Sequence, residues 1–454
     1  MTRTMKPKQN EIDMTHGPVA KKLFLFAVPL ALSSMLQQLF NAADLAVVGR
    51  FANPQAMAAV GSNASVISML LSLFIGLSVG ANVVVGNLLG AGRRERLSDA
   101  VHTIISLALI SGVLLMILGN LAAKPILTMM GAPEDVLELA VQYLRIYFCG
   151  MPMITLYNFA AAILRSKGDS TRPFAAMVIA GVVNVGLNLF FVIALHLHVI
   201  GVALATVLSN CLSAGLTVRF LMREPDEFHL ELRRLRIDPA LLRKIVQIGL
   251  PAGVQGMVFS ISNVVIQTAV NGFGSDCIAG MTAGQNFDFV SYCLMNAFAQ
   301  ACVTFTSQNY GAGDAERCRR VWREAMMMGV VIDMVFIGVM LLFKNSLIRL
   351  FTTDPAVIQY AMIRINYAFA VHFLCATYEI TGGALRGMNR SAIPAIISVV
   401  GTCAVRLLYV RFFFPLYGTP VVLILVYPVT WIITCIAMNT AYFIARRKAF
   451  ASIA

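Results

Sequence analysis

The chain alternates long runs of apolar residues with short polar segments. A helix needs about 20 mainly apolar residues to cross the hydrocarbon core of a bilayer. Backbone groups in lipid must be hydrogen-bonded within the protein, so runs of this length indicate helices. The pattern predicts twelve transmembrane helices, at 23–48, 56–88, 98–120, 136–163, 173–195, 199–222, 243–272, 277–308, 319–343, 357–384, 391–414 and 420–445.

Composition supports a polytopic membrane protein. Hydrophobic residues make up 58% of the 454 positions and charged residues 13%, whereas a soluble domain averages about 45–50% apolar and about 25% charged residues. The net charge of +13 is spread over short basic segments between apolar runs. This distribution is typical of a membrane topology, and it argues against nucleic acid as a partner.

The positions of lysine and arginine predict the orientation. If the N-terminus is cytoplasmic, the inside segments hold 27 of these residues and the outside segments hold 5. Cytoplasmic loops carry the excess of Lys and Arg. We therefore expect a multi-pass protein of the cell (inner) membrane with both termini in the cytoplasm.

An internal repeat divides the twelve helices into two equal halves. LRSKGDSTRP at 164–173 is echoed by LRGMNRSAIP at 385–394, and GAGRRER at 90–96 by GAGDAER at 311–317. Pro29 and Pro251 are 222 positions apart, as are Asn41 and Asn263. Six helices per half is an even number, so both halves start on the same side of the membrane, in a layout known among transporters.

The predicted fold class is an all-α integral membrane protein, with twelve transmembrane helices in two six-helix lobes related by a parallel internal repeat. The predicted parts are a cytoplasmic tail at 1–22, an N-lobe at 23–222, a cytoplasmic linker at 223–242, a C-lobe at 243–445 and a cytoplasmic tail at 446–454.

Several chemistries have no motif in this chain. The nine cysteines are scattered, without a CxxC pair or a Cys/His group at zinc spacing, so we expect neither disulfides nor a metal site. There is no GxxxxGK[ST] sequence for nucleotide phosphates and no HExxH set for a membrane-embedded protease. We expect a protein without a cofactor that is not an enzyme.

Six segments together resemble the MATE family of multidrug and toxic compound extrusion transporters. The resemblance covers about residues 18–447. It implies two six-helix lobes around a central cleft, with efflux driven by a proton or sodium gradient, and an acidic residue in the first helix places the chain on the DinF-like side. The matching segments are PLALSSMLQQLFNAADLAVVGR (29–50), AAVG (58–61), GNLLGAGRRE (86–95), LRSKGDSTRP (164–173), SQNYGAGDAER (307–317) and GGALRG (382–387).

The expected function is export of lipophilic, cationic small molecules by a monomeric secondary transporter, in exchange for protons or sodium. A lipid-linked saccharide flippase of related architecture is the alternative. Such a flippase favours a cleft lined by several Arg or Lys side chains that hold a pyrophosphate.

Asp44 is the first candidate for the coupling site, because a carboxylate inside a membrane helix is costly and marks function by default. It could instead cap the helix end or pair with Arg50. Asn184 and Asn188 share one helix face, and Thr206 lies at a similar depth in the next helix. The resemblance implies that these four bind the coupling ion. Some relatives have Asp where this chain has Asn188, which puts a two-carboxylate site in doubt.

The second half has its own polar stripe on helix 277–308, and we expect it to line the substrate cleft. Asp288 in this stripe could attract a cation or bind a second proton. Glu379 could instead pair with Arg386, and Asp333 is expected to be structural. We expect no ligand set from His196, His198 and His372. The residues expected at the cleft are Asn41, Asn158, Gln285, Asp288, Tyr292, Asn296 and Glu379.

Overall fold

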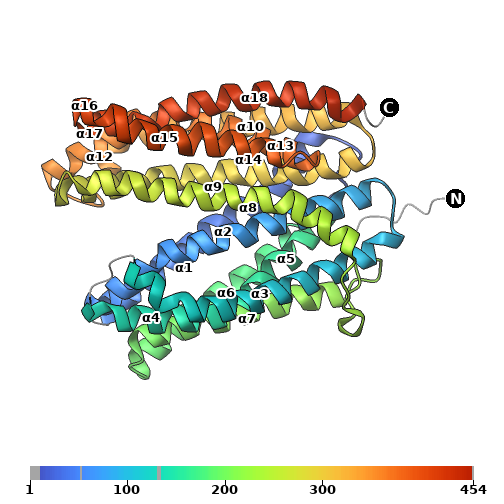
Figure 1. Cartoon of the computed structure of the whole chain (residues 1–454), viewed down its shortest axis with the longest axis horizontal. Coiled ribbons are helices and arrows are strands. Elements are labelled where there is room, and N and C mark those ends of the chain that lie inside the picture. The colour runs from blue at the N-terminus through green and yellow to red at the C-terminus, as the bar shows by residue number, and fades with distance from the viewer. Residues whose placement is uncertain (1–10, 52–53, 130–133, 452–454) are drawn as a thin grey trace. The chain divides into compact units, whose positions relative to one another are not determined.

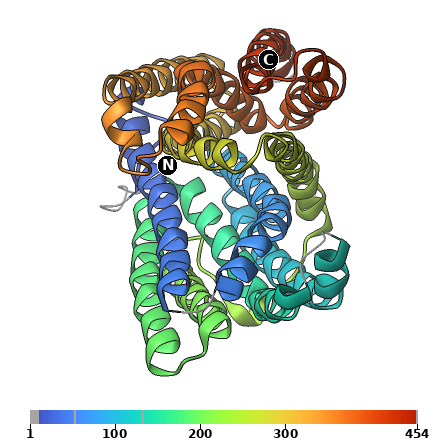
Figure 2. The ribbon, with the colours of Figure 1, turned by 90° about the vertical axis from the view of Figure 1, so that its left-hand side faces the viewer.

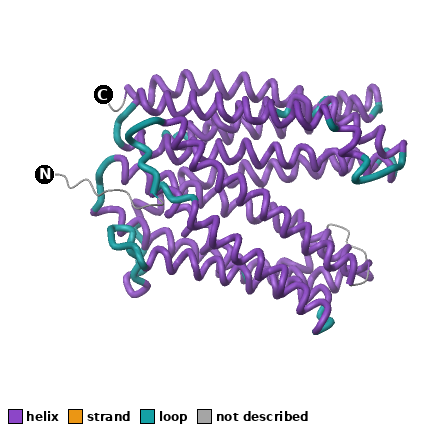
Figure 3. Tube along the Cα trace, turned by 180° about the vertical axis from the view of Figure 1, so that it is seen from behind, coloured by secondary structure: helices purple, strands orange, loops and turns teal. Residues whose placement is uncertain are grey.

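The computed structural model describes residues 11–51, 54–129 and 134–451. These residues form α-helices, short 3-10 and π-helical turns and loops, and they contain no β-strand (Figure 3). Within them, ten helices are long and apolar enough to cross a membrane, and one bent pair of helices raises this number to eleven. The predicted all-α integral membrane fold is confirmed.

The chain forms two compact units. The first unit consists of Leu32–Gly249 together with the described residues up to Asp13. Helix α5 packs against α2, α3 and α7, and α6 packs against α7 (Figure 2). Its elements are α1 (Val19–Phe51, from Leu32 on), α2 (Pro54–Gly90), α3 (Glu95–Met129), α4 (Glu134–Cys149), α5 (Met151–Lys167), α6 (Thr171–Leu189), η1 (Phe190–Ala194), α7 (His198–Met222) and η2 (Leu232–Arg234).

The second unit consists of Met14–Ala31 and the chain from Leu250 onward. Helix α9 packs against α10, α12 and α13, and α18 packs against α13 (Figure 1). Its elements are α8 (Pro239–Asn271, from Leu250 on), α9 (Ser275–Gly311), α10 (Ala315–Leu342), α11 (Lys344–Ile348), α12 (Pro355–Tyr367), η3 (Phe369–Val371), α13 (Phe373–Gly387), α14 (Ala392–Ser398), η4 (Val399–Ala404), α15 (Val405–Leu408), η5 (Tyr409–Phe413), α16 (Phe414–Tyr417), α17 (Pro420–Ile424) and α18 (Val426–Ala451).

The first helix of each half passes from one unit to the other. Helix α1 changes units between Ala31 and Leu32, and α8 does so between Gly249 and Leu250. The repeat-related Pro29 and Pro251 lie inside these helices, next to the crossing points. Proline removes a backbone hydrogen bond and kinks a helix. Each compact unit thus takes in the beginning of the other half's first helix.

Two of the twelve predicted spans are broken. The span predicted at 136–163 is the pair α4 and α5, which bend by 46° at Gly150, just before Pro152 in the first turn of α5. The span predicted at 357–384 is divided into α12, the turn η3 and α13. Neither part of this second span is long enough to cross a bilayer by itself.

The repeat is visible in the backbone as well as in the residue types. Gly92 and Gly313 both have positive φ, 67° and 75°, and they are 221 positions apart in the two GAG turns. Gly168 and Asn389, also 221 positions apart, have φ values of 105° and 62°. Positive φ suits Gly and, less often, Asn. The two echoed motifs thus form the same helix-ending turns.

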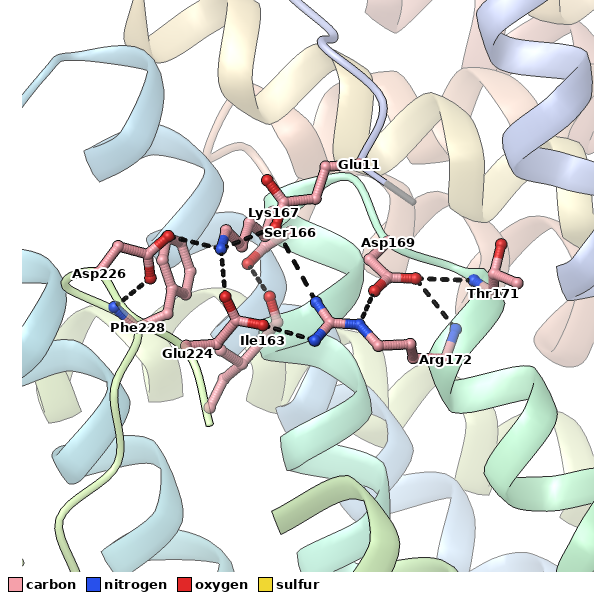
Figure 4. Close-up of polar contacts among 10 residues, drawn as sticks. All are labelled: Glu11, Ile163, Ser166, Lys167, Asp169, Thr171, Arg172, Glu224, Asp226 and Phe228. Atoms are coloured by element: carbon pink, nitrogen blue, oxygen red, sulfur yellow. Dashed lines mark hydrogen bonds and ion pairs between the residues drawn. The ribbon is translucent and has the colours of Figure 1, made fainter. Parts of the chain in front are cut away.

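The segment LRSKGDSTRP forms a buried ion-pair cluster between α5 and α6 (Figure 4). The Lys167 Nζ lies 2.6 Å from a carboxylate oxygen of Glu224, 2.6 Å from Asp226 and 2.8 Å from Glu11. Arg172 pairs with Asp169 and lies 2.5 Å from the second oxygen of Glu224. Buried charges need such partners, and the cluster thereby fixes the turn between the two helices to the segment after α7.

Gly168 is required at the centre of this turn. It ends α5 with φ of 105°, and its carbonyl accepts a hydrogen bond of 3.1 Å from the Ile12 backbone N–H. A Cβ atom at this position would lie 2.3 Å from the Ile12 carbonyl oxygen. The side chain of Asp169 then accepts hydrogen bonds from the first two backbone N–H groups of α6, which have no partner within the helix.

The predicted linker at 223–242 folds against α3 instead of running free. Asp238 accepts a 2.8 Å hydrogen bond from Arg96, and its backbone N–H donates to Thr103. Hydrogen bonds from the backbone N–H groups of Leu241 and Ala240, with Arg96 nearby, hold the pKa of Asp238 below its usual value. The Asp238 carboxylate is therefore charged at neutral pH while it caps the start of α8.

Candidate functional site

Three of the four residues predicted at the coupling site meet in the first unit. The Asn188 side-chain amide in α6 donates a 2.5 Å hydrogen bond to Oδ1 of Asp44 in α1. The same amide lies 3.2 Å from Oδ1 of Asn184, one turn earlier in α6. The Asn184 amide in turn donates to the Ser209 hydroxyl in α7 at 3.3 Å. All four side chains are buried, and they link α1, α6 and α7 through one polar chain.

The sequence explains how α6 presents these amides. Asn184 and Asn188 are spaced by one helical turn, so they project from the same face. Gly181, one turn before Asn184, leaves room for Phe40 of α1, because a Cβ atom there would lie 1.8 Å from the Phe40 ring. The π-helical turn η1 begins directly after Leu189. Such turns widen a helix locally and are frequent at functional sites.

One buried oxygen at this site lacks a partner. The side-chain oxygen of Asn188 has no hydrogen bond within the described part of the chain, although Asn188 is fully buried. Leaving a buried acceptor unsatisfied costs about 1–3 kcal/mol. A proton on the Asp44 carboxyl group or a bound cation could satisfy this oxygen.

The remaining candidates of the first unit lie apart from this chain of hydrogen bonds. The Thr206 hydroxyl donates to the Val202 carbonyl of its own helix at 2.9 Å, and Asn158 donates to Ile154 at 2.8 Å. Asn41 is exposed on α1. Ser209 takes the place expected for Thr206, three residues further along α7. Sequence reasoning missed it, because Ser and Thr recur at several positions of this helix.

Asp288 in the second unit is neutralised by a partner that we did not predict. Both Nε and Nη2 of Arg364, in α12, lie 2.7 Å from its Oδ2. The side chains of both residues are largely buried, and Asp288 Oδ1 has no hydrogen-bond partner among the described residues. Since Arg364 falls well inside the span predicted at 357–384, its charge was the available signal. Asp288 therefore does not present a net negative charge to a substrate.

A second buried arginine lies next to this pair. The Arg406 guanidinium is 4.7 Å from the centre of the Tyr427 ring, and Arg364 lies over the same ring at 5.1 Å. Arg406 also donates to the side-chain oxygen of Asn263 at 3.1 Å. Stacking on aromatic rings and hydrogen bonding to amides stabilise a desolvated guanidinium. This aromatic and amide shell holds both arginines in place.

The other residues predicted at the cleft are spread along α9 and α13. Glu379 lies 3.8 Å from Arg386, so the expected pairing of these two residues is present, and Arg386 also donates to Gln255 at 2.9 Å. Gln285 and Tyr292 are exposed on α9, and Asn296 is half-buried. Among the described residues, no group of three or more His, Cys, Asp or Glu side chains is arranged to hold a metal ion.

Comparison with known proteins agrees with this architecture. The model of the MatE family matches residues 29–190 and 251–410, one segment in each half. A probable multidrug resistance protein, YoeA of Bacillus subtilis (strain 168), is 29% identical over 390 residues, or 84% of each chain. The probable multidrug resistance protein NorM of Thermotoga maritima is 27% identical over 399 residues, which are 86% of this chain and 84% of that protein.

A solved structure shares the fold. It is the outward-facing conformation of a multidrug resistance MATE family transporter of the MOP superfamily. The TM-score is 0.88 at 23% sequence identity, and the match covers 98% of this chain and 99% of the other.

The pairing of Asp288 with Arg364 yields a prediction about stability. We expect Asp288→Leu and Arg364→Met each to lower the free energy of unfolding by about 3–5 kcal/mol, because each leaves a buried charge without its partner. The double variant should recover most of this loss. Thermal and denaturant unfolding of the four proteins in detergent measures the coupling. Losses that simply add in the double variant would show that the two side chains do not depend on each other.

Proposed function

Because this chain belongs to the MATE family of transporters, we propose that it exports lipophilic cations in exchange for protons. The observation that carries the proposal is the hydrogen bond between Asn188 and Asp44 at a buried position of the first unit. This carboxylate has an amide as its partner instead of an arginine or lysine. Its charge can therefore be cancelled by a proton that comes and goes.

Protonation of Asp44 changes what the site can bond to. The ionised carboxylate accepts the Asn188 N–H, whereas the protonated group also carries an O–H donor. That donor can satisfy the orphaned Asn188 oxygen after a small rotation of the amide. A proton thus stabilises one arrangement of α1 and α6 over another, and a ligand shifts a conformational equilibrium only through such differential binding. One charge that crosses about 100 mV supplies about 2.3 kcal/mol.

The donor set favours a proton over sodium. Sodium, like other hard cations, binds several oxygen atoms. At this site Asn188 presents an N–H group to the carboxylate, and Asn184 directs its own N–H groups toward Ser209. One carboxylate that accepts an amide N–H is a poor cage for a metal cation, but this hydrogen bond stabilises the ionised form of a group that exchanges a proton.

The direction of transport follows from the proposed topology. With both termini in the cytoplasm, the basic loops and the Lys167 cluster lie on the cytoplasmic side of the inner membrane. The polar chain around Asp44 then lies toward the outer ends of its helices. We infer that protons reach Asp44 from outside while the substrate leaves on that side.

Lipophilic cations are the substrate class that we propose. The similar proteins YoeA and NorM are named probable multidrug resistance proteins. Within the second unit, Glu379 is less deeply buried than Asp288 and has a longer ion pair, at 3.8 Å. Together with the exposed ring of Tyr292, it is the better candidate for contact with a cation.

The flippase alternative is less consistent with the arginines of the second unit. Holding a pyrophosphate requires several free guanidinium or ammonium groups. Arg364 is paired with Asp288, and Arg406 is fully buried against Tyr427 and Asn263. Neither presents its full set of donors to an anionic ligand.

The first functional prediction concerns Asp44→Asn, an isosteric change that cannot cycle a proton. We expect cells that express this variant, and lack other efflux pumps, to accumulate a fluorescent lipophilic cation to the same level as cells without the transporter. Asp276→Asn, an exposed carboxylate at the start of α9, is the matched control and should behave as wild type. Efflux by Asp44→Asn at the wild-type rate, at equal expression, would refute the proposed role.

A second prediction uses Asn188→Asp. The change replaces the amide that bonds Asp44 by a second carboxyl group. Two carboxyl groups at such close range cannot both ionise without a large cost in free energy. We expect the pH optimum of efflux to move upward or sodium to stimulate transport. Asn188→Ala should only weaken coupling. Titrations of pH and sodium with purified protein in proteoliposomes compare the three forms, and unchanged profiles in Asn188→Asp would show that the two positions do not share one site.

A further inference from the structure

A second buried titratable cluster lies in the second unit and is not part of the site described above. Asp333 of α10, Ser291 of α9 and His372 before α13 are brought together, with Asp333 and Ser291 fully buried and His372 only 4% exposed. The Ser291 hydroxyl bonds to Oδ1 of Asp333 and lies 2.8 Å from Nδ1 of His372. The other Asp333 oxygen lies 3.7 Å from the same nitrogen.

The Asp333 carboxylate has no arginine or lysine partner within the described part of the chain. Its Oδ2 atom also lacks a hydrogen bond there, although the residue is fully buried. A buried ion that no partner compensates destabilises the folded protein, all the more so inside a membrane helix. His372 is thus the ionisable group in a position to compensate Asp333.

On the surrounding helices, two pairs of charged side chains form ion pairs. On α9, Asp288 is paired with Arg364 of α12, and on α13, Glu379 is paired with Arg386. Toward α18, the edge of the His372 ring meets Trp431, with ring centres 5.4 Å apart, and Trp431 meets Tyr427 beneath the two arginines. Further charged side chains of these elements are Asp276 of α9, Glu316, Arg317, Arg319, Arg320, Arg323 and Glu324 of α10, Lys344 of α11, which bonds Asn366, and Arg446, Arg447 and Lys448 of α18. Cys293 of α9 and Cys375 and Tyr378 of α13 are further titratable groups.

The hydrogen bonds determine where a proton can be added. The Ser291 hydroxyl donates to Asp333, so its oxygen accepts from His372, and Nδ1 of the ring must carry a hydrogen. The lone pair of the neutral ring then lies on Nε2. In this state the cluster bears the single negative charge of Asp333. A proton that bonds to Nε2 produces an imidazolium beside the carboxylate, and the cluster becomes neutral overall.

We propose that Asp333, Ser291 and His372 form a second proton-binding site, which takes up and releases one proton within the second unit. The donor set fits a proton better than a metal cation, because it offers one carboxylate, one hydroxyl and an imidazole, whereas hard cations require several oxygen ligands. The inference does not depend on the proposed exchange at Asp44, which lies in the other unit. From the sequence, Asp333 is expected to be structural and His372 is expected to belong to no ligand set. The two residues come together only through the packing of α9, α10 and α13.

Nuclear magnetic resonance of the histidine rings tests this proposal directly. The chain contains six histidines, so protein labelled with nitrogen-15 at histidine in detergent gives few signals, and His372→Gln identifies one of them by its loss. We expect the His372 signals to change from the neutral form protonated on Nδ1 to the imidazolium as the pH falls from about 8 to about 5. In Asp333→Asn, which removes the stabilising anion, this change should move to lower pH or vanish.

Controls separate a specific effect from a loss of structure. Thr434→Val removes a buried hydrogen bond to Thr402 in the same unit, and it should leave the His372 titration unchanged. If His372→Gln does not fold, a variant that keeps His372 as its sole histidine gives the same assignment. His372 signals that stay constant over this range, or that titrate identically in Asp333→Asn, would overturn the proposal. An inactive Asp44→Asn protein would still show the titration, so the two proposals can fail separately.

Discussion

A charged side chain inside a bilayer raises the free energy of the folded protein unless a partner compensates its charge. The buried ions of the second unit show this constraint at work. Asp288 is held by Arg364, Arg406 is enclosed by Asn263 and the Tyr427 ring, and Asp333 meets His372. In the first unit, Asp44 is bonded to the neutral amide of Asn188. It therefore has no oppositely charged partner at this hydrogen bond, and this difference is the basis of the proposed exchange of protons.

The internal repeat allows positions of the two units to be compared directly. Arg406 is 222 positions after Asn184, the same spacing that relates Asn263 to Asn41. In the second unit this arginine brings a permanent positive charge, which Asn263 and aromatic rings hold in place. In the first unit the corresponding helix carries amides beside a carboxylate. At these related positions the second unit thus holds a fixed cation, whereas the first unit holds amides beside the carboxylate for which we propose proton exchange.

The long apolar runs made most of the fold predictable. Ten long membrane helices and the repeated turns follow from run length and from glycine and proline at fixed spacing, whereas the bend between α4 and α5 was not predicted. The exchange of helix ends between the units at Pro29 and Pro251 could not be derived, because it depends on which helices pack together over long distances in sequence. For the same reason the division of the span at 357–384 was not foreseen.

The candidate sites were predictable in part. Asp44 and the two asparagines stood out because polar side chains are rare in such helices, and helical spacing placed Asn184 and Asn188 on one face. The partners were not predictable, since Ser209, Arg364 and the pairing of Asp333 with His372 each join segments far apart in the sequence. A charged residue in a span signals that a partner exists, but its identity depends on the packing of the helices.

The proposal that protons alone drive transport through Asp44 can be tested by imposing one gradient at a time. Purified protein in proteoliposomes can be given either a pH step without sodium or a sodium step at equal pH, while the movement of a lipophilic cationic dye is followed. We expect the dye to move against its own gradient, opposite to the protons, after the pH step, and we expect no dye movement after the sodium step. Transport driven by the sodium step alone would contradict it.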